Sequence, residues 1–264
     1  MMRGASADAY AAAEQVLAQG GDSAQVGQDL FAVADLLRSE PSLRRVATDV
    51  SVPGDAKAAL LTQVLSGKVS SDALTVATTA VSQRWTASRD LADALENLGV
   101  VAVVRSAGSE GSRLEDELFA VSQLLKDNPE LRHAFSDPAR SREDKAGLVR
   151  NLLGDKVLPA TTTLVEQSLS GSHRTVGAAL AEYQKVAADA RGQGVATVRV
   201  ARPLTDADRQ RLADVLARTY GREIHLNVVV DPEVIGGIRV EIGDDVIDGT
   251  VASRLDDARR KLAG

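Results

Sequence analysis

The chain has 264 residues, of which 44% are hydrophobic and 3% aromatic, and its formal net charge is −6. It contains no cysteine, which excludes disulfides, iron–sulfur clusters and thiolate zinc sites, and the negative charge argues against nonspecific binding to nucleic acid or to an anionic membrane surface. No apolar run approaches the roughly 20 residues of a membrane-spanning helix. No apolar leader precedes Asp8, so we expect no signal peptide, no membrane insertion and a cytoplasmic protein.

The first part of the chain repeats itself. Residues 30–69 align without a gap on residues 118–157, an offset of 88, with 16 identities in 40 positions. In both copies apolar residues recur at helical spacing, three or four residues apart. A proline follows in each copy, Pro41 or Pro129, which ends one helix and can stand in the first turn of the next. A duplicated helical unit therefore precedes the rest of the chain.

We expect a mostly α fold, with two related antiparallel helical bundles followed by a small α+β C-terminal domain. The first bundle is expected over residues 1–90 and the second over residues 91–192, and one long helix near residues 89–105 closes the first and opens the second. Trp85 is the sole tryptophan. We expect it to pack inside a bundle, and a partner-facing anchor is the alternative.

The composition changes after Gly194, and residues 193–264 form the expected C-terminal domain. Residues 195–200 alternate with period two and are rich in β-branched side chains, which is typical of a strand. Thr205 with Asp208 predicts the start of a helix that ends at Gly221, with an apolar stripe at Leu212, Val215, Leu216 and Thr219. Further strands are expected over 223–231, 234–242 and 246–248, and a last amphipathic helix from Gly249.

No catalytic arrangement is found along the chain. Gly67-Lys68 lacks the earlier glycine and the following hydroxyl of a phosphate-binding loop. The three histidines lie far apart, and no serine stands in a nucleophile elbow. We therefore expect no catalytic residue, no cofactor, no metal and no small-molecule substrate, and an enzyme is the weaker alternative.

The C-terminal residues resemble a known signature. Its first part includes Val234, Ile235, Gly236 and Gly237, and its second part includes Val246, Ile247, Asp248, Gly249, Arg254 and Leu255. Over these positions the chain resembles the delta subunit of F-type ATP synthase, whose mitochondrial counterpart is the oligomycin-sensitivity-conferring protein. The helical part agrees, because Leu124-Leu125-x-x-Asn128-Pro129-Glu130-Leu131 is similar to the N-terminal bundle of that family. The resemblance covers residues 91–264 as one complete member, and the additional bundle looks like the long actinobacterial form.

The resemblance implies a stator subunit without chemistry of its own. A delta subunit links the catalytic alpha/beta head to the b-type peripheral stalk, so that proton-driven rotation is coupled to ATP synthesis. The implied partners are the N-terminal helices of the alpha subunits and the b-type stalk subunits. The implied place is the cytoplasmic face of the plasma membrane, as a peripheral part of the complex. A helical adaptor in another cytoplasmic assembly is the alternative.

The resemblance also implies where partners bind. A groove between the first and a later helix of a bundle would take the alpha-subunit helix. In the first copy this implies Tyr10, Ala13 and Leu17, facing Leu74, Ala77 and Val81; in the second copy it implies Leu95, Leu98, Val101 and Ala102, facing Leu164 and Leu169. Which copy binds alpha is open, and our hypothesis is that both do. The C-terminal signature residues either hold the stalk or maintain the fold of their own domain.

Overall fold

The structure, a computed structural model, describes residues 2–20, 23–170, 172–232, 234, 236–243 and 245–250. The chain divides into two compact units, residues Met1–Ala187 and Ala188–Gly264, which are described separately. Within the described ranges there are twelve α-helices and one four-stranded sheet, so the expected mostly α fold with a small α+β C-terminal domain is confirmed. In this part of the chain, no helix is both long and apolar enough to span a lipid bilayer.

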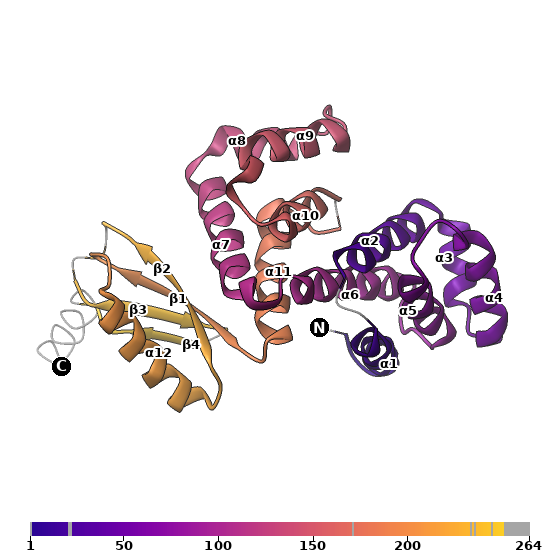
Figure 1. Cartoon of the computed structure of the whole chain (residues 1–264), viewed down its shortest axis with the longest axis horizontal. Coiled ribbons are helices and arrows are strands. Elements are labelled where there is room, and N and C mark those ends of the chain that lie inside the picture. The colour runs from indigo at the N-terminus through magenta and orange to yellow at the C-terminus, as the bar shows by residue number, and fades with distance from the viewer. Residues whose placement is uncertain are drawn as a thin grey trace, which may run out of the picture. The chain divides into compact units, whose positions relative to one another are not determined.

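The first unit begins with six helices, which Figure 1 shows in indigo to purple. They are α1 (Ala5–Gln19), α2 (Ala24–Ser39), α3 (Pro41–Thr48), α4 (Gly54–Leu65), α5 (Ser71–Ser82) and α6 (Asp90–Ser106). Trp85 lies between α5 and α6, is 5% exposed, and its indole N–H donates to the carbonyl of Ala80 at 2.8 Å. The expectation that Trp85 packs inside the bundle is therefore confirmed.

The second copy follows with the same order of elements. Its helices are α7 (Gly111–Asp127), α8 (Pro129–Ser136), α9 (Arg142–Leu153), α10 (Pro159–Gln167) and α11 (Val176–Ala190), with short 3-10 turns at Gly108–Glu110, Gly154–Lys156 and Ser168–Ser170. The bounds of α3 and α8, and those of α4 and α9, differ by the offset of 88 found in the sequence. The duplication is therefore visible as matching helices.

One contact is duplicated although its residues differ. The carboxylate of Asp29 in α2 accepts from the backbone N–H of Ser70 at 2.7 Å, at the N-terminus of α5. Eighty-eight residues later, the carboxylate of Glu117 in α7 accepts from the backbone N–H of Leu158 at 2.8 Å, at the N-terminus of α10. A carboxylate there satisfies N–H groups that the helix leaves unpaired and complements the helix dipole. The start of α5 is thus bound by a carboxylate on α2, and the start of α10 by a carboxylate on α7.

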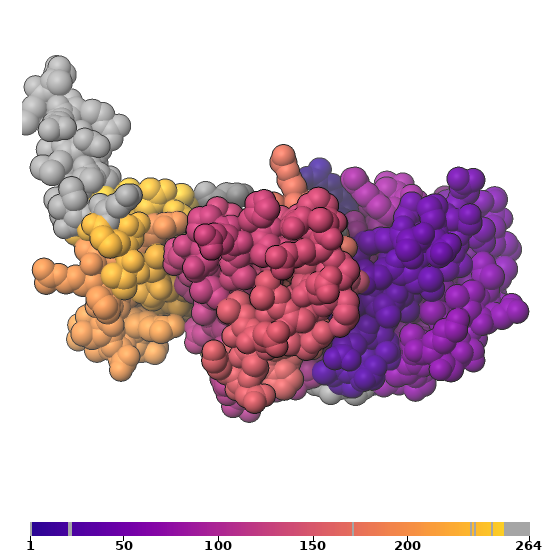
Figure 2. Space-filling view, turned by 90° about the horizontal axis from the view of Figure 1, so that it is seen from above, coloured from indigo at the N-terminus to yellow at the C-terminus, as the bar shows by residue number. Residues whose placement is uncertain are grey.

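Helix α6 is shared by the two copies. It contacts α1, α2 and α5 of the first copy and α7 and α10 of the second, and its residues from Leu98 to Val104 are all buried. A helix that is apolar on every face belongs in a core rather than at a surface. Figure 1 shows α6 running from the first bundle to the second, and Figure 2 shows the purple surface of the first bundle against the pink surface of the second.

Two glycines allow α2 and α6 to approach closely. A Cβ placed on Gly99 of α6 would lie 2.6 Å from the ring of Phe31 and 3.0 Å from the carbonyl oxygen of Gly27, both in α2. A Cβ on Gly27 would lie 2.4 Å from Val103. The shortest of these distances are below what a Cβ tolerates, so any other residue at either position would require Phe31, Val103 or one of the helices to shift.

The second unit is a mixed sheet with one helix in its chain. Its elements are β1 (Gly194–Val200), α12 (Asp206–Tyr220), β2 (Ile224–Val230), β3 (Ile238–Ile242) and β4 (Asp245–Asp248), and the strand order is β2-β1-β3-β4. Strands β1 and β2 are parallel, whereas β3 is antiparallel to both β1 and β4. The parallel pair requires a crossover, which α12 supplies; Figure 1 shows α12 lying across one face of the sheet.

The expected caps of α12 are present, but its apolar stripe was partly wrong. Thr205 accepts from the N–H of Asp208, and Gly221 ends the helix with a φ of 69°. Leu216 is buried and Leu212 packs against the sheet core. Val215 is 51% exposed, because the packed face continues through Ala213 and Tyr220 instead. The last helix expected from Gly249 lies outside the described residues, and β3 begins only at Ile238.

We predict that Gly99→Ala destabilises the helical unit by about 1–3 kcal/mol, because the added methyl group overpacks the contact with Phe31. Gly147→Ala in α9 is the matched control, since a Cβ there meets no atom within 4 Å and alanine is the better helix former. Urea unfolding followed by circular dichroism measures both. Equal midpoints for the two variants would contradict the close approach of α2 and α6.

Candidate functional site

The six residues expected to form a groove in the first copy lie on two contacting helices. Ala13 and Leu17 in α1, and Ala77 and Val81 in α5, are buried, and α1 contacts α5 directly. Tyr10 and Leu74 are half-buried at the edge of this contact. The four buried side chains therefore help to hold the helices in place, and Tyr10 and Leu74 are the members of the set that remain partly exposed.

The residues expected to form the groove of the second copy are more deeply covered. Leu95, Leu98, Val101 and Ala102 in α6 and Leu164 in α10 are between 0% and 3% exposed. Leu169, in the 3-10 turn after α10, is half-buried. The two copies thus place equivalent helices together, α1 with α5 and α6 with α10, but they differ in how far those helices face outward.

A buried carboxylate at the middle of α6 joins four other segments. Glu96 is 2% exposed. Its Oε2 accepts from Arg38 Nη2 of α2 at 2.6 Å, and its Oε1 accepts from Gln167 Nε2 of α10 at 3.2 Å and from Ser172 Oγ at 2.7 Å. The hydroxyl of Tyr183, which is fully buried in α11, also donates to Oε1. Residues from both copies therefore meet on one charge.

The electrostatics of this group follow from its partners. Burial alone would raise the pKa of Glu96, but the hydrogen bond from Tyr183, the charge of Arg38 and the hydrogen bonds from Ser172 and Gln167 outweigh it, so the pKa lies below its ordinary value. Burial and the charge of Glu96 raise the pKa of Tyr183, which stays a neutral donor. His173 packs edge-on against the Tyr183 ring, with centroids 5.8 Å apart. A fully bonded charge of this kind positions helices.

Sequence reasoning missed this polar centre. Glu96 stands between Leu95 and Leu98 of the long, mostly apolar helix, and an acidic residue on its apolar side is the signal that could have identified it. Its partners stand 58 and 87 residues away along the chain, at Arg38 and Tyr183, and nothing in the sequence alone pairs them.

In the C-terminal signature, Gly237 lies close against the backbone of Gly249. Gly237 has a φ of 87°, and a Cβ there would lie 2.4 Å from the carbonyl oxygen of Gly249. The N–H of Gly249 donates to the carbonyl of Ile238 at 2.9 Å. Asp248 accepts from the hydroxyl and the N–H of Thr250, at 2.7 and 2.9 Å, and these bonds lower its pKa. These residues hold together the start of β3 and the end of β4, at the end of the hairpin opposite its turn.

Other signature residues face outward or fall outside the described part of the chain. Val246 and Ile247 of β4 are 55% and 47% exposed, at the edge of the sheet. Val234 and Gly236 are half-buried. Ile235, Arg254 and Leu255 lie outside the described residues.

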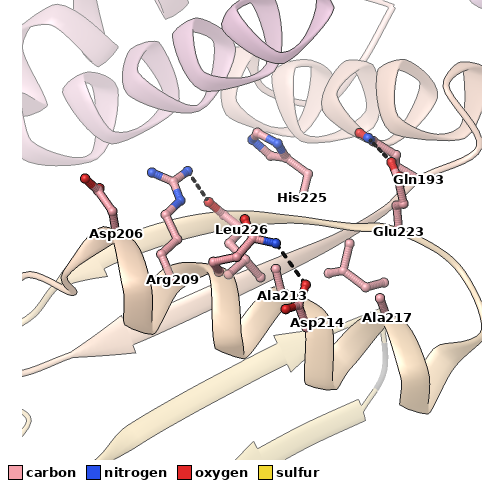
Figure 3. A pocket seen from close by; sticks show the side chains of 11 residues that line it. Gln193, Asp206, Arg209, Ala213, Asp214, Ala217, Glu223, His225 and Leu226 are labelled. Atoms are coloured by element: carbon pink, nitrogen blue, oxygen red, sulfur yellow. Dashed lines mark hydrogen bonds between the residues drawn. The ribbon is translucent and has the colours of Figure 1, made fainter.

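A polar cleft of about 520 Å³ lies between α12 and the edge strand β2. Figure 3 shows its lining, with Arg209 of α12 donating to the carbonyl of Leu226 at 3.1 Å and Gln193 donating to Glu223 at 2.9 Å. Asp206, Asp214 and His225 complete a rim of mixed charge. Among the residues that the structure describes, no group of three His, Asp or Glu side chains is placed to hold a metal ion. The cleft offers charged contacts beside an open strand edge.

The comparisons with known proteins decide the family. The family model described as ATP synthase delta (OSCP) subunit matches residues 100–262. The chain belongs to this family. The ATP synthase subunit delta of Nocardioides sp. is 57% identical, over 100% of this chain and 98% of that protein, and that of Kineococcus radiotolerans is 45% identical, over 99% and 98%. The expected identity as a peripheral-stalk subunit of F-type ATP synthase is confirmed, and delta subunits are structural subunits.

The first bundle is shared with these relatives. The family model begins at residue 100, but the Nocardioides alignment covers the whole chain, so residues before the family match have counterparts there.

A chain in the cryo-EM structure of the Toxoplasma gondii mitochondrial ATP synthase hexamer is 22% identical, with a TM-score of 0.36, over 62% of this chain and 95% of that one.

We predict that Glu96→Gln lowers the free energy of unfolding by about 3 kcal/mol at neutral pH, because it breaks a buried charge pair. A lowered folded pKa means that the charge of Glu96 stabilises the fold above its unfolded pKa, about 4.3, and this contribution is lost as the pH falls through the folded value. The variant lacks that part of the acid dependence. Denaturant unfolding at a series of pH values from about 3 to about 7 measures the free energy of unfolding of both proteins and its dependence on pH.

The exposed Glu130 in α8 supplies the control. Glu130→Gln is expected to change stability by less than about 1 kcal/mol. A loss at Glu96→Gln no larger than that would show that Glu96 does not hold the helices together.

We predict that Gly237→Ala destabilises the C-terminal unit by about 3 kcal/mol or more, because the positive φ and the contact with the Gly249 carbonyl act together. Gly243→Ala, where φ is 58° and a Cβ meets no atom within 4 Å, is expected to lose only about 1–2 kcal/mol. Thermal loss of strand signal by circular dichroism compares the two. A smaller loss at Gly237 than at Gly243 would contradict the close approach.

Proposed function

We propose that this chain is the joint between the catalytic head and the peripheral stalk of its ATP synthase. The helical unit binds an N-terminal helix of the alpha subunit, the C-terminal unit binds the b-type stalk subunits, and the chain carries out no reaction itself. It resists the torque of the rotor at the cytoplasmic face of the plasma membrane, as a peripheral part of the complex. The observation that carries this proposal is membership of the delta family, with a delta subunit that aligns over the whole chain.

The α1–α5 contact supports the first half of the proposal. It is a pair of adjacent helices with small buried residues between them and half-buried Tyr10 and Leu74 at its edge. Recognition of one amphipathic helix by a pair of helices relies on apolar area and shape. A joint under continuous torque needs slow dissociation, which such a contact can provide.

The edge of the small sheet supports the second half. Val246 and Ile247 form an exposed apolar pair on edge strand β4, and edge strands usually carry charge instead. We propose that this pair contacts the b-type subunit. The neighbouring Gly237, Asp248 and Gly249 bring the start of β3 against the end of β4, in keeping with a role of the signature glycines in the fold.

The test of the head contact is calorimetric titration of the full chain with a synthetic peptide of its own alpha subunit's N-terminal helix. We expect a dissociation constant in the micromolar range or tighter, about −8 kcal/mol. If neither the peptide nor the assembled alpha/beta head binds, the proposal is wrong, and a helical adaptor of another assembly becomes the better account.

We predict that replacing Val246 and Ile247 together by Asp weakens binding of the b-type subunit by at least about tenfold, because the apolar contact area is lost. Both side chains are about half exposed on an edge strand, so we expect the sheet to form in the variant, and circular dichroism checks that the strand signal is retained. Val215→Asp, at an exposed position of α12, is the control and should bind normally. Unchanged binding by the double variant would exclude β4 as the stalk contact.

A further inference from the structure

Strand β2 has the composition of a segment that pairs readily with strands of other chains. It is seven residues long and contains no proline, no glycine and no Asp, Glu, Lys or Arg. Apart from His225 and Asn227, every residue is Ile, Leu or Val. Segments of this length with high β propensity, low net charge and no proline are prone to form intermolecular sheets. Among the described strands, β2 stands at one end of the order β2-β1-β3-β4, so it pairs with a strand on one side only.

The register shows which backbone groups of β2 point away from β1. In a parallel pair, alternate residues of a strand bond to its neighbour. The carbonyl of Glu223, just before β2, accepts from the N–H of Gly194 at 2.7 Å, so the odd-numbered residues bond to β1. The N–H and C=O groups of the even-numbered residues therefore point outward. We call these groups, on Ile224, Leu226 and Val228, the outer edge of β2.

Arg209 of α12 already occupies this outer edge. Its Nη2 donates to the carbonyl oxygen of Leu226 at 3.1 Å, as Figure 3 shows. A strand added to β2 would have to place one of its own N–H groups at that oxygen, and it would first have to displace the guanidinium. A hydrogen bond from a charged donor is stronger than one from a neutral amide, so this exchange opposes pairing.

The cleft beside the outer edge adds a second obstacle. Asp206, Asp214 and Glu223 line it together with Arg209, and all three carboxylates belong to exposed residues. An added strand would cover these carboxylates and remove water from them, which costs free energy unless the strand supplies a partner for each. Charged side chains beside an edge strand are a common protection against pairing with another chain.

The strand at the other end of the order is built differently. Strand β4 has only four residues, and Asp245 and Asp248 place a carboxylate at each of its ends. A short edge strand with charges is a poor template for pairing. Because β2 is longer and has no carboxylate or ammonium of its own, its protection has to come from α12.

From these observations we infer that Arg209 blocks the pairing of β2 with a strand of a second copy of this chain. The crossover helix α12 then has two roles, since it connects the parallel strands β1 and β2 and also holds a guanidinium at the outer edge of β2. This inference concerns association between copies of the chain, and it does not depend on the proposed function.

The inference is tested with Arg209→Ala in the full chain. We expect aggregation, followed by thioflavin T fluorescence and sedimentation velocity, to be at least about tenfold faster than in the wild type, because a charge-assisted hydrogen bond no longer opposes pairing. Arg211→Ala is the matched control, since this arginine of α12 has a side chain that is 80% exposed and does not line the cleft. It should aggregate at the wild-type rate. Equal rates for the two variants would overturn the inference.

A second substitution separates edge pairing from a mere loss of stability. Val228→Pro removes an N–H of the outer edge that does not bond to β1, so it weakens pairing with an added strand, but it cannot restore stability lost at Arg209. We expect the double variant Arg209→Ala, Val228→Pro to aggregate at the wild-type rate, with its strand signal in circular dichroism retained. A folded double variant that aggregates as fast as Arg209→Ala would overturn the inference.

Hydrogen exchange locates the contact without the proline variant. The N–H groups of Leu226 and Val228 belong to the outer edge, so we expect them to exchange more slowly in associated Arg209→Ala than in the monomer. The N–H of Asn227, which faces β1, is the internal control and should change less. Unchanged exchange at Leu226 and Val228 would place the contact elsewhere and overturn the inference.

Discussion

The helical unit depends on helix α6, which is buried on all sides from Leu98 to Val104 and carries a buried carboxylate, Glu96, near its middle. The stretch Leu98–Val104 can be apolar all round only because both copies pack against α6. Glu96 can remain ionised there only because Arg38, Gln167, Ser172 and Tyr183 surround its two oxygens. Each partner comes from a different segment, so the carboxylate is satisfied only when the two copies are assembled. The bundles are thereby constrained to act as one body, which suits a part that transmits force.

Duplication explains why two copies of one unit came to differ. A single copy needs a helix at its end, and here the last helix of the first copy is also the first helix of the second. This sharing brings α2 of the first copy onto the outer face of α6 and α10. Helix α2 therefore covers one face of α6, and this contact adds to the apolar surface that the chain buries. The corresponding face of α1, at the start of the chain, has no such neighbour on Ala11 and Gln15, which are exposed.

Much of the fold could be predicted from the sequence because local signals set it. Pro41 and Pro129 begin α3 and α8, Ser141 and Thr205 cap α9 and α12, and Gly221 ends α12. The repeat itself predicted the shared helix. What could not be predicted depends on contacts between distant segments. The equivalence of Asp29 and Glu117 was not recognised, because the two copies have different residues at this position. Val215 was wrongly predicted to pack on the sheet, because the periodicity of α12 does not determine the angle at which the helix meets the sheet.

The candidate site was predicted less well than the fold, for the same reason. Resemblance indicated the helices involved, α1 with α5 and α6 with α10, and the structure brings each pair into contact. It could not indicate that Leu95 and Leu98 are fully buried, because their covering depends on how one copy packs on the other. The contact between Gly27 and Gly99 was not predicted either, because the sequence around a helical glycine does not indicate which helix packs against it.

The central claim is that α6 makes the two bundles one cooperative unit. Native-state hydrogen exchange tests it directly in a Leu61→Ala variant, whose substitution lies in α4 of the first bundle and removes a buried side chain, 1% exposed, at a loss of about 2–5 kcal/mol. The account predicts that the slowest amides of α10 and α11 in the second bundle lose the same free energy of protection as those of α2. Loss confined to α2–α5, with α10 and α11 unchanged, would contradict it.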